Sequence, residues 1–326
     1  MVRNGGCAVA TRVLIEPPGE VRHYYLRLES VKLKDFDEIG RYDLPAVVDY
    51  ILDLTGFSKL GLLAISQGAT DVLVFLSMLP EYNRKVNIFV AYAPVANITH
   101  FTTPLRLLFP LTEPLTMIND IFTHGGLLVS NPLKQMMIAT ACNSPLREVC
   151  YLPYAIIFGK NAKQHNSTRV PVYIASFPAG TSTKTVLHYT QVYRARNFVR
   201  FDYGILKNLV KYGQVKPPAY PLEQIRVPVA IYQGQGDNFA VPQDMDDLSE
   251  RLKHVLVLKY MVPDPDFGHL DFLMGFNATA ILHSHMMYLI SQYTTVQLSF
   301  ECDKRVHVLS PCSLRMKEKK NAVESS

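Results

Sequence analysis

The chain has 326 residues, a formal net charge of +5 and 48% hydrophobic residues. This composition is typical of a globular protein with a sizeable core and excludes a disordered chain. No apolar run reaches the ~18 residues of a membrane span, and the first residues lack the apolar segment of a signal peptide. Much of the positive charge lies in a C-terminal stretch that we interpret as a solvated tail, which argues against a nucleic-acid-binding protein: Arg315, Lys317, Lys319 and Lys320.

Both ends of the chain stand apart from the rest. Residues 1–33 form a divergent N-terminal segment, in which a Pro-Pro-Gly turn separates two alternating stretches, 12–16 and 22–33, that suit a hairpin. Residues 292–326 are predicted to be an appendage with a disordered basic end.

Between the two ends, helices and strands alternate. A helix is predicted over 43–56, where Asp43 can cap its start and Gly56 ends it. The apolar run 59–66 is typical of a strand buried on both faces, a helix follows it, and 86–93 is a second buried strand. This order predicts an α/β fold with a mostly parallel sheet and helices on both faces.

A long insertion interrupts this alternation. We divide the chain into a first part of the core (34–98), the insertion (99–225) and a second part of the core (226–291). The insertion is expected to form a cap over the carboxyl edge of the sheet, where open α/β sheets bind ligands. The second part resumes the alternation with two strands and two helices, at 227–237, 242–253, 254–262 and 277–291.

Ser66 lies where the first predicted strand turns into its helix, within Ala-Ile-Ser-Gln-Gly (64–68). A serine on such a sharp turn projects its hydroxyl above the sheet, and the turn needs small residues two before and two after it. Gly68 satisfies this requirement, and Ala64 adds only a methyl group where glycine is usual. The pattern favours a nucleophile; a structural helix cap is the alternative for Ser66.

A nucleophilic serine needs a base, and the base needs a carboxylate that orients it. Asp237 follows a predicted strand, and His269 follows the next strand and a Pro-rich loop. Both therefore lie at the same edge as Ser66, in the chain order Ser, acid, His. The competing carboxylates are Asp264, Asp266 and Asp271 in the His loop, and Asp244 and Asp246, which are better explained as helix-dipole partners.

Metal chemistry finds little support in the sequence. His283 and His285 lie two apart on a predicted helix and point apart, and no other His or Cys cluster completes a zinc site. The predicted chemistry therefore uses neither a metal nor a cofactor. The backbone N–H of Gln67 is the expected oxyanion donor; a second donor is not evident.

These residues resemble the acid lipases, the gastric and lysosomal enzymes and their invertebrate relatives. The similarity covers roughly residues 34–291 and includes specific stretches, among them DLPAVVDYILDLTG (43–56), SFPAGTSTKTVLHYTQV (176–192) and GHLDFLMG (268–275). The resemblance implies an α/β-hydrolase fold that hydrolyses neutral lipid esters under a mobile cap. It assigns the nucleophile to Ser66, the acid to Asp237 and the base to His269.

The sequence also departs from that family. In acid lipases the nucleophile is flanked as Gly-His-Ser-Gln-Gly. The region upstream of the matching part of those lipases holds a signal peptide, the first strands of the sheet and a His-Gly-Leu loop that gives the second oxyanion donor. Residues 1–33 do not resemble this region. We therefore interpret the chain as a truncated or alternatively spliced member, or as an incomplete gene model, with its first strands missing.

Three hypotheses for function follow. The first is a lipase that acts on triacylglycerol or cholesteryl ester at a lipid–water interface, secreted or lysosomal as the resemblance implies. The second is a catalytically impaired relative that only binds lipid, and the third is an esterase for small acyl substrates. The apolar stretch 103–122 would line an acyl pocket or simply pack.

The cysteine count and the glycosylation sequons bear on the compartment. The five cysteines are an odd number, which does not define a disulfide framework. Two pairs are close enough for a local bridge, and free buried thiols explain either pair equally well: Cys142 with Cys150, and Cys302 with Cys312, Cys7 being the fifth. Three sequons favour a secretory context, at Asn97, Asn166 and Asn277.

Overall fold

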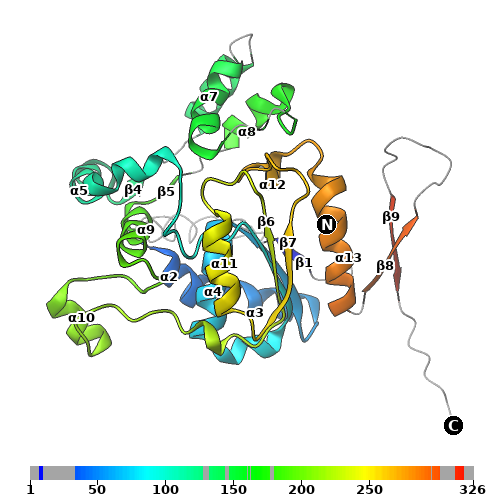
Figure 1. Ribbon diagram of the computed structural model, residues 1–326, viewed down its shortest axis with the longest axis horizontal. Coiled ribbons are helices and arrows are strands. Elements are labelled where there is room, and N and C mark those ends of the chain that lie inside the picture. Colours follow the sequence, from blue (N-terminus) through cyan, green and yellow to red (C-terminus); the bar gives the residue numbers. More distant parts are fainter. Residues whose placement is uncertain are drawn as a thin grey trace.

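The computed structural model describes residues 7–9, 34–127, 132–143, 147–159, 161, 163–176, 180–294, 296–301 and 313–318. At its centre is a sheet of five strands in the order β1-β2-β3-β6-β7, with every neighbouring pair parallel (Figure 1). The strands are β1 (Cys7–Val9), β2 (Leu60–Ile65), β3 (Val86–Tyr92), β6 (Val229–Gln233) and β7 (Leu256–Met261). The predicted α/β fold is confirmed, and residues 1–33 contribute one short strand to its sheet.

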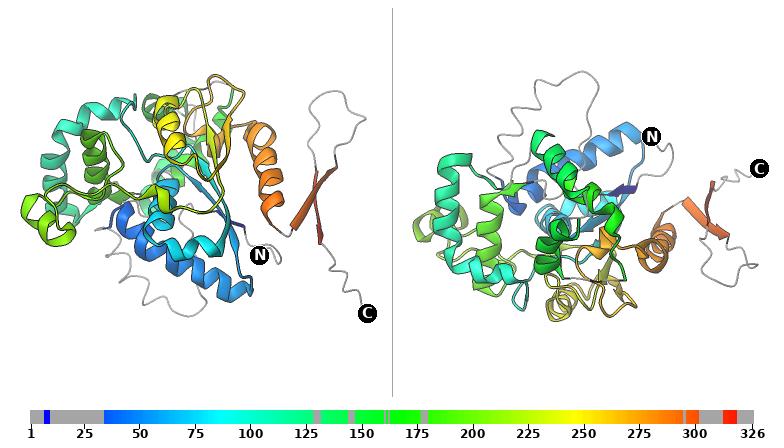
Figure 2. Two further views of the ribbon diagram at one scale, coloured as in Figure 1. Left: turned by 60° about the horizontal axis from the view of Figure 1, so that its bottom comes forward. Right: turned by 90° about the horizontal axis from the view of Figure 1, so that it is seen from above.

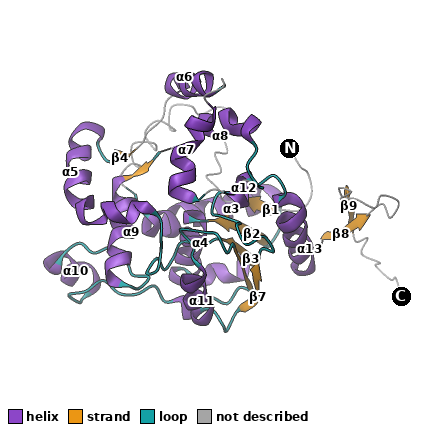
Figure 3. Ribbon diagram, turned by 45° about the horizontal axis from the view of Figure 1, so that its top comes forward, coloured by secondary structure: helices purple, strands orange, loops and turns teal. Residues whose placement is uncertain are grey.

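Helices cover both faces of the sheet, which is why β2 and β6 are buried along their whole length. On one face lie α4 (Gln67–Met78) and α11 (Pro242–Arg251), and on the other lies α13 (Ser284–Tyr293) (Figures 1 and 3). Every residue of α4 from 69 to 77 is buried. This helix is therefore enclosed on all sides and forms part of the core.

The first long helix begins earlier than the predicted start at Asp43. The chain enters helix at α2 (Phe36–Glu38), passes through a π-helical turn (Ile39–Asp43) and continues as α3 (Leu44–Thr55). Asp35 caps the start, since its side chain accepts from the amides of residues 37 and 38 while the Glu38 side chain accepts from the Asp35 amide. Asp43 makes no capping bond. The predicted end at Gly56 is confirmed, because Gly56 has a φ of 71°.

The carboxyl ends of the strands lie side by side. Ile65 pairs with Tyr92, Tyr92 with Tyr232, and Tyr232 with Tyr260. The loops that leave β2, β3, β6 and β7 therefore start from one edge, where side chains distant in sequence can meet.

Between β3 and β6 the chain forms a mainly helical segment. Its main elements are the 3-10 helix Pro104–Leu111, α5 (Thr112–Thr123), β4 (Gly126–Leu127), α6 (Pro132–Cys142), α7 (Arg147–Phe158), α8 (Val170–Ser176), β5 (Thr181–Ser182), α9 (Thr183–Ala195) and α10 (Ile205–Tyr212). The helices α7 and α8 lie beyond the carboxyl edge of the sheet, near α12 (Asp271–Met274), whereas α5 and α10 lie at one end of the long axis (Figures 1 and 2).

A disulfide joins Cys142 at the end of α6 to Cys150 in α7. One of the two local bridges left open by the sequence is thus present; Cys302 and Cys312 lie outside the described residues. Cys142 also packs with Val170 and Ile174 of α8 in a small hydrophobic cluster separate from the main core. The helices α6, α7 and α8 therefore share a core of their own.

A buried ionic junction ties the segment before α2 to α9. His188 Nδ1 lies 2.9 Å from the Asp35 carboxylate, and both side chains are fully buried. Lys184 pairs with Glu38, and the His188 ring stacks on Phe36 with centroids 3.8 Å apart. The base of the inserted segment is fixed to the core through these contacts.

The C-terminal part differs from the predicted disordered end. Strands β8 (Val296–Glu301) and β9 (Ser313–Glu318) pair as an antiparallel hairpin beyond α13 (Figure 1). Arg315 and Lys317 belong to β9, because alternation of residue type along this stretch suits a strand as well as a charged tail. The predicted hairpin within 12–33 and the lysines at 319 and 320 lie outside the described residues. No described helix is long and apolar enough to cross a bilayer.

The contact between the π-helical turn and α4 generates a stability prediction. A Cβ on Gly40 would lie 2.7 Å from both the Asp71 carbonyl oxygen and Val74 Cβ. Gly40→Ala is therefore expected to lower the free energy of unfolding by about 1–3 kcal/mol, measured by urea denaturation. Gly61→Ala is the control, since its Cβ would meet Ile88 at an ordinary 3.7 Å. Equal stability of the two variants would contradict this account.

Candidate active site

Ser66 sits on a strained turn between β2 and α4. Its φ of 53° and ψ of −125° place it in a region that non-glycine residues rarely adopt. The Ser66 amide still bonds the Tyr92 carbonyl of the neighbouring strand at 2.9 Å, so the turn begins at the very end of the sheet. Ala64 is buried and pairs with Ala91, which keeps this approach narrow. The serine is only half-buried.

Asp237 is held by the close approach of two loops. A Cβ on Gly234 would lie 2.2 Å from the Phe267 carbonyl oxygen, and one on Gly236 would lie 2.7 Å from that of Asp266. Only glycine permits this contact, and the Gly236 amide uses it to donate to Phe267 at 3.1 Å. The loop after β6 is therefore fixed directly against the loop that carries His269.

The buried Asp237 carboxylate is satisfied on both oxygens. Its Oδ1 accepts from the amides of Phe239 and Ala240 at 2.7 and 2.8 Å, and its Oδ2 lies 2.8 Å from His269 Nδ1. The backbone bonds fix the carboxylate in place, so that it can in turn fix the imidazole.

His269 links the other two residues. Its Nε2 lies 2.7 Å from Ser66 Oγ while its Nδ1 faces Asp237. With the proton on Nδ1 directed at the carboxylate, Nε2 is free to accept the serine proton. The structure thus brings Ser66, Asp237 and His269 into one hydrogen-bonded chain across 203 positions of sequence.

Aromatic side chains enclose the imidazole. The rings of Phe158, the last residue of α7, and Phe239 lie 6.0 and 5.0 Å from the His269 ring. Phe158 belongs to the inserted segment, so this segment contributes directly to the wall of the site. The sequence does not predict this contact, because nothing local marks Phe158 as different from the other apolar residues of α7.

The competing carboxylates of the His loop have other partners. Asp264 accepts from the side chains of Asn161 and Gln164 at 3.2 and 3.0 Å, and Asp266 lies 3.5 Å from the exposed Lys163. Asp271 accepts from the Gly268 amide at 2.8 Å. Among the described carboxylates, Asp237 alone hydrogen-bonds His269.

The expected oxyanion donor lies at the start of α4. Gln67 is the first residue of this helix, so its amide has no carbonyl partner within the helix. This amide lies in the same turn as Ser66, at the positive end of the helix dipole. The structure of the described residues identifies no second donor.

Comparison with known proteins identifies the family of this chain. A family model of the alpha/beta hydrolase fold matches residues 29–276. The chain belongs to the alpha/beta hydrolase fold family. Within this hydrolase-fold family the resemblance to acid lipases is confirmed by curated relatives. The chain is 33% identical to lipase member N of Mus musculus and 33% identical to lysosomal acid lipase/cholesteryl ester hydrolase of Rattus norvegicus, each over 260 residues.

Coverage of the relatives is partial. Gastric triacylglycerol lipase of Bos taurus is 32% identical over 259 residues. In all three comparisons the match takes in 79% of this chain and 64% of the relative. The chain therefore spans less than two thirds of the length of the lipases it matches.

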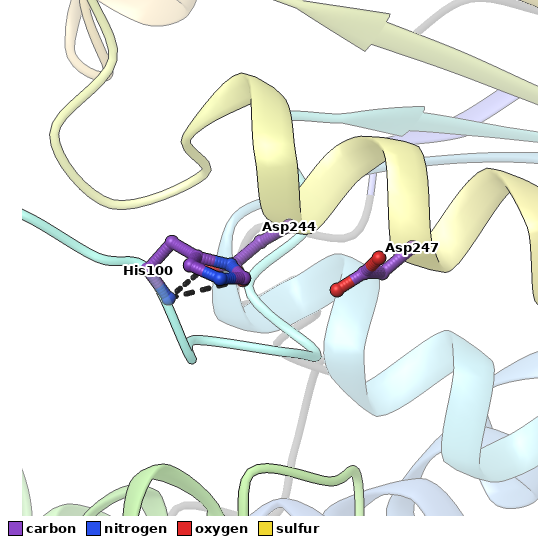
Figure 4. Close-up of side chains that lie close together, drawn as sticks. All are labelled: His100, Asp244 and Asp247. Atoms are coloured by element: carbon purple, nitrogen blue, oxygen red, sulfur yellow. Dashed lines mark hydrogen bonds and ion pairs between the residues drawn. The ribbon is translucent and has the colours of Figure 1, made fainter.

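A His–carboxylate group lies outside the Ser66 site of this hydrolase-fold chain (Figure 4). A ring nitrogen of His100 and a carboxylate oxygen from each of Asp244 and Asp247 lie within 4.8 Å of one another. The buried Asp244 carboxylate accepts from the His100 amide at 3.0 Å and lies 2.9 Å from its Nδ1, and Asp247 accepts from Asn97. These bonds anchor the start of the inserted segment to α11. No local pattern predicts these bonds, because His100 and Asp244 are 144 positions apart.

The remaining histidines and acids of interest have structural partners. His283 Nε2 lies 3.1 Å from the Phe272 carbonyl, and His285 Nδ1 lies 3.0 Å from the Tyr232 hydroxyl. Asp246 pairs with Lys259 on the surface. Among the sequons, Asn97 is buried, Asn166 is half-buried and Asn277 is exposed, so the last two are better placed to carry a glycan.

Asp271 generates a pH prediction. Burial raises the pKa of its carboxyl to about 6, with smaller contributions from Asp264 and Asp237. The stability that protonated Asp271 contributes is therefore fully present below about pH 4 and is lost as the pH rises through about 6. Relative to Asp271→Asn, the wild type should lose about 2.4 kcal/mol of unfolding free energy between pH 4 and pH 7, measured by urea denaturation.

The exposed Asp266 supplies the matched control for this measurement. Asp266→Asn should leave the pH dependence of stability unchanged. If Asp271→Asn and the wild type showed the same slope, the raised pKa of Asp271 would be wrong.

Proposed function

We propose that this chain is a carboxylic ester hydrolase that cleaves neutral lipid esters, triacylglycerols or cholesteryl esters, through an acyl-enzyme on Ser66. The observation that carries the proposal is the hydrogen-bonded chain from Asp237 through His269 to Ser66. The names of the relatives, cholesteryl ester hydrolase and triacylglycerol lipase, supply the substrate class.

In the first half of the proposed reaction, His269 Nε2 takes the Ser66 proton as Oγ attacks the ester carbonyl. The Gln67 amide donates to the oxygen that becomes negative, and Asp237 stabilises the imidazolium. His269 then gives the proton to the departing alcohol oxygen, and the acyl group stays on Ser66.

In the second half, water replaces the alcohol. His269 accepts a proton from the water, whose oxygen attacks the acyl carbonyl, and then returns a proton to Ser66 Oγ as the fatty acid leaves. Each half uses only side chains already in contact, and no metal or cofactor takes part in it.

Exposed apolar side chains of the inserted segment support a lipid substrate. Many exposed large apolar side chains lie within residues 107–172. They include most of the large apolar side chains of the stretch 103–122, which is therefore not ordinary core. Those of this stretch are Leu107, Leu108, Leu111, Leu115, Met117, Ile118, Ile121 and Phe122. Continuous apolar surface marks interaction sites on soluble proteins, and the concentration of exposed apolar side chains in one segment supports such a role here. A water-soluble short ester would not require it.

We further propose that residues 99–225 act as the cap, that 34–98 and 226–291 form the hydrolase core, that 1–33 is a divergent N-terminal segment, and that 292–326 is a C-terminal appendage. The Cys142–Cys150 disulfide supports passage through an oxidising compartment. With the accessible sequons at Asn166 and Asn277, it supports a secreted or lysosomal protein, as the name of the rat relative suggests.

One observation favours a second candidate, a relative that binds lipid without hydrolysing it. We propose a single oxyanion donor, the Gln67 amide, and loss of one donor typically costs about 10²–10³ in rate. The two candidates share the cap and differ in turnover.

Replacement of the nucleophile tests the proposal directly. Ser66→Ala should reduce hydrolysis of an emulsified triacylglycerol by about 10⁴-fold or more, since no other group in the site can form the acyl-enzyme. Titration of released fatty acid measures the rate, and Ser58→Ala, at an exposed serine before β2, is the matched control.

The outcomes separate the hypotheses. Activity that survives Ser66→Ala would sink the proposed mechanism. A folded but inactive wild type would favour the lipid-binding relative, and turnover of p-nitrophenyl butyrate alone would favour an esterase for small substrates.

The orienting acid gives a separate test. Asp237→Asn should lower kcat by about 10³–10⁴-fold with little change in KM, because an amide no longer selects the productive imidazole tautomer. Steady-state kinetics on the ester used above provides both constants. Asp246→Asn, on the exposed side of α11, should leave both unchanged, and an equal loss in the two variants would contradict the role of Asp237.

A further inference from the structure

The helix α10 presents its apolar side chains to solvent. Leu206 and Val210 are 80% and 88% exposed, and Ile205 and Leu209 are 62% and 45% exposed. At 100° per residue these four positions fall on one arc of the helix. A surface helix of a globular protein normally turns such an arc toward the core. In α10 the apolar arc faces solvent instead.

Polar groups attach α10 to the rest of the chain. The buried Asn208 side chain donates to Asp202 and to the Val215 carbonyl, each at 2.7 Å, and the Tyr212 hydroxyl donates to the Phe201 carbonyl at 2.9 Å. These two residues form the inward side of the helix. The outward apolar arc is therefore held in place by polar bonds, and its exposure is a property of the folded state.

Basic residues border the apolar arc. Lys207 and Lys211 follow it around the helix, and Lys216 lies beyond the C-terminal Gly213; all three lysines are exposed. Lys211 lies over the Tyr203 ring at 3.9 Å, and neither Lys207 nor Lys216 has an ion-pair partner among the described residues. The nearby Asp202 carboxylate accepts hydrogen bonds from the Gly204 amide and from the Asn208 side chain.

We propose that α10 is a docking element for a phospholipid surface that carries anionic headgroups. An exposed apolar arc beside lysines is the composition of helices that lie in the membrane interface, with the apolar side chains inserted and the cations at the headgroups. Figure 1 shows α10 standing out from the body at the end of the long axis opposite β8 and β9, where a flat surface can reach it.

The geometry favours a lipid surface over a second copy of the chain. A helix of eight residues is roughly 12 Å long, whereas a stable protein interface needs about 800 Å² from each partner. The lysines would also repel their counterparts in a symmetric pair. This docking does not depend on hydrolysis, so it stands or falls separately from the proposed esterase activity.

The test is co-sedimentation of the full chain with phosphatidylcholine vesicles, with and without phosphatidylserine. These vesicles contain neither triacylglycerol nor cholesteryl ester, the substrates proposed above. Binding should increase with phosphatidylserine and weaken with salt. The double variant Leu206→Gln with Val210→Gln should bind about tenfold more weakly, and Lys207→Glu and Lys216→Glu should each cost about fivefold or more on the anionic vesicles only.

Leu54→Gln, at a 69% exposed leucine of α3, is the matched control and should bind like the wild type. Unfolding by urea checks that each variant is folded. Binding that is equal for the wild type and the Leu206→Gln/Val210→Gln variant would overturn the proposal, as would binding indifferent to phosphatidylserine. A wild-type dimer in sedimentation velocity that the double variant abolishes would identify a second copy as the occupant instead.

Discussion

The close approach of two loops at the carboxyl edge of the sheet is the constraint on which the candidate site depends. Gly234 and Gly236 let the loop after β6 pack backbone to backbone against residues 266 and 267. That contact sets Asp237 against His269, and parallel alignment of the strands places Ser66 opposite them. A side chain at either glycine would separate the two loops. The contact between Asp237 and His269 therefore requires glycine at both positions.

Much of this arrangement follows from local signals in the sequence. Buried strands read as continuous apolar runs, and parallel strands end at one edge, so the order Ser66, Asp237, His269 predicted which side chains could meet. The start of the first long helix, predicted at Asp43, is also marked in the sequence, because Asp35 and Glu38 have the spacing of a capping box. Contacts such as His188 with Asp35 and His100 with Asp244 have no local signature, since their partners are more than a hundred positions apart in the chain.

Buried charge is concentrated where the inserted segment joins the core. Asp35 and His188 are fully buried together, and the neighbouring Lys184 compensates Glu38, whose pKa burial raises to about 7. Removing one member of such a group leaves an uncompensated charge in the interior, which is costly. The orientation of α9 on the core is therefore sensitive to the loss of any one member of this ionic junction.

The separate hydrophobic cluster of α6, α7 and α8 has an evolutionary consequence. Its residues pack on one another and are joined by the Cys142–Cys150 bridge, while the main core lies around the sheet. Because distant sites contribute nearly additively to stability, substitutions in this outer cluster can accumulate at little expense to the sheet. Phe158, at the end of α7, carries such changes to the wall around His269. The side chains around the candidate site can thus diverge among related chains while the arrangement of Ser66, Asp237 and His269 stays the same.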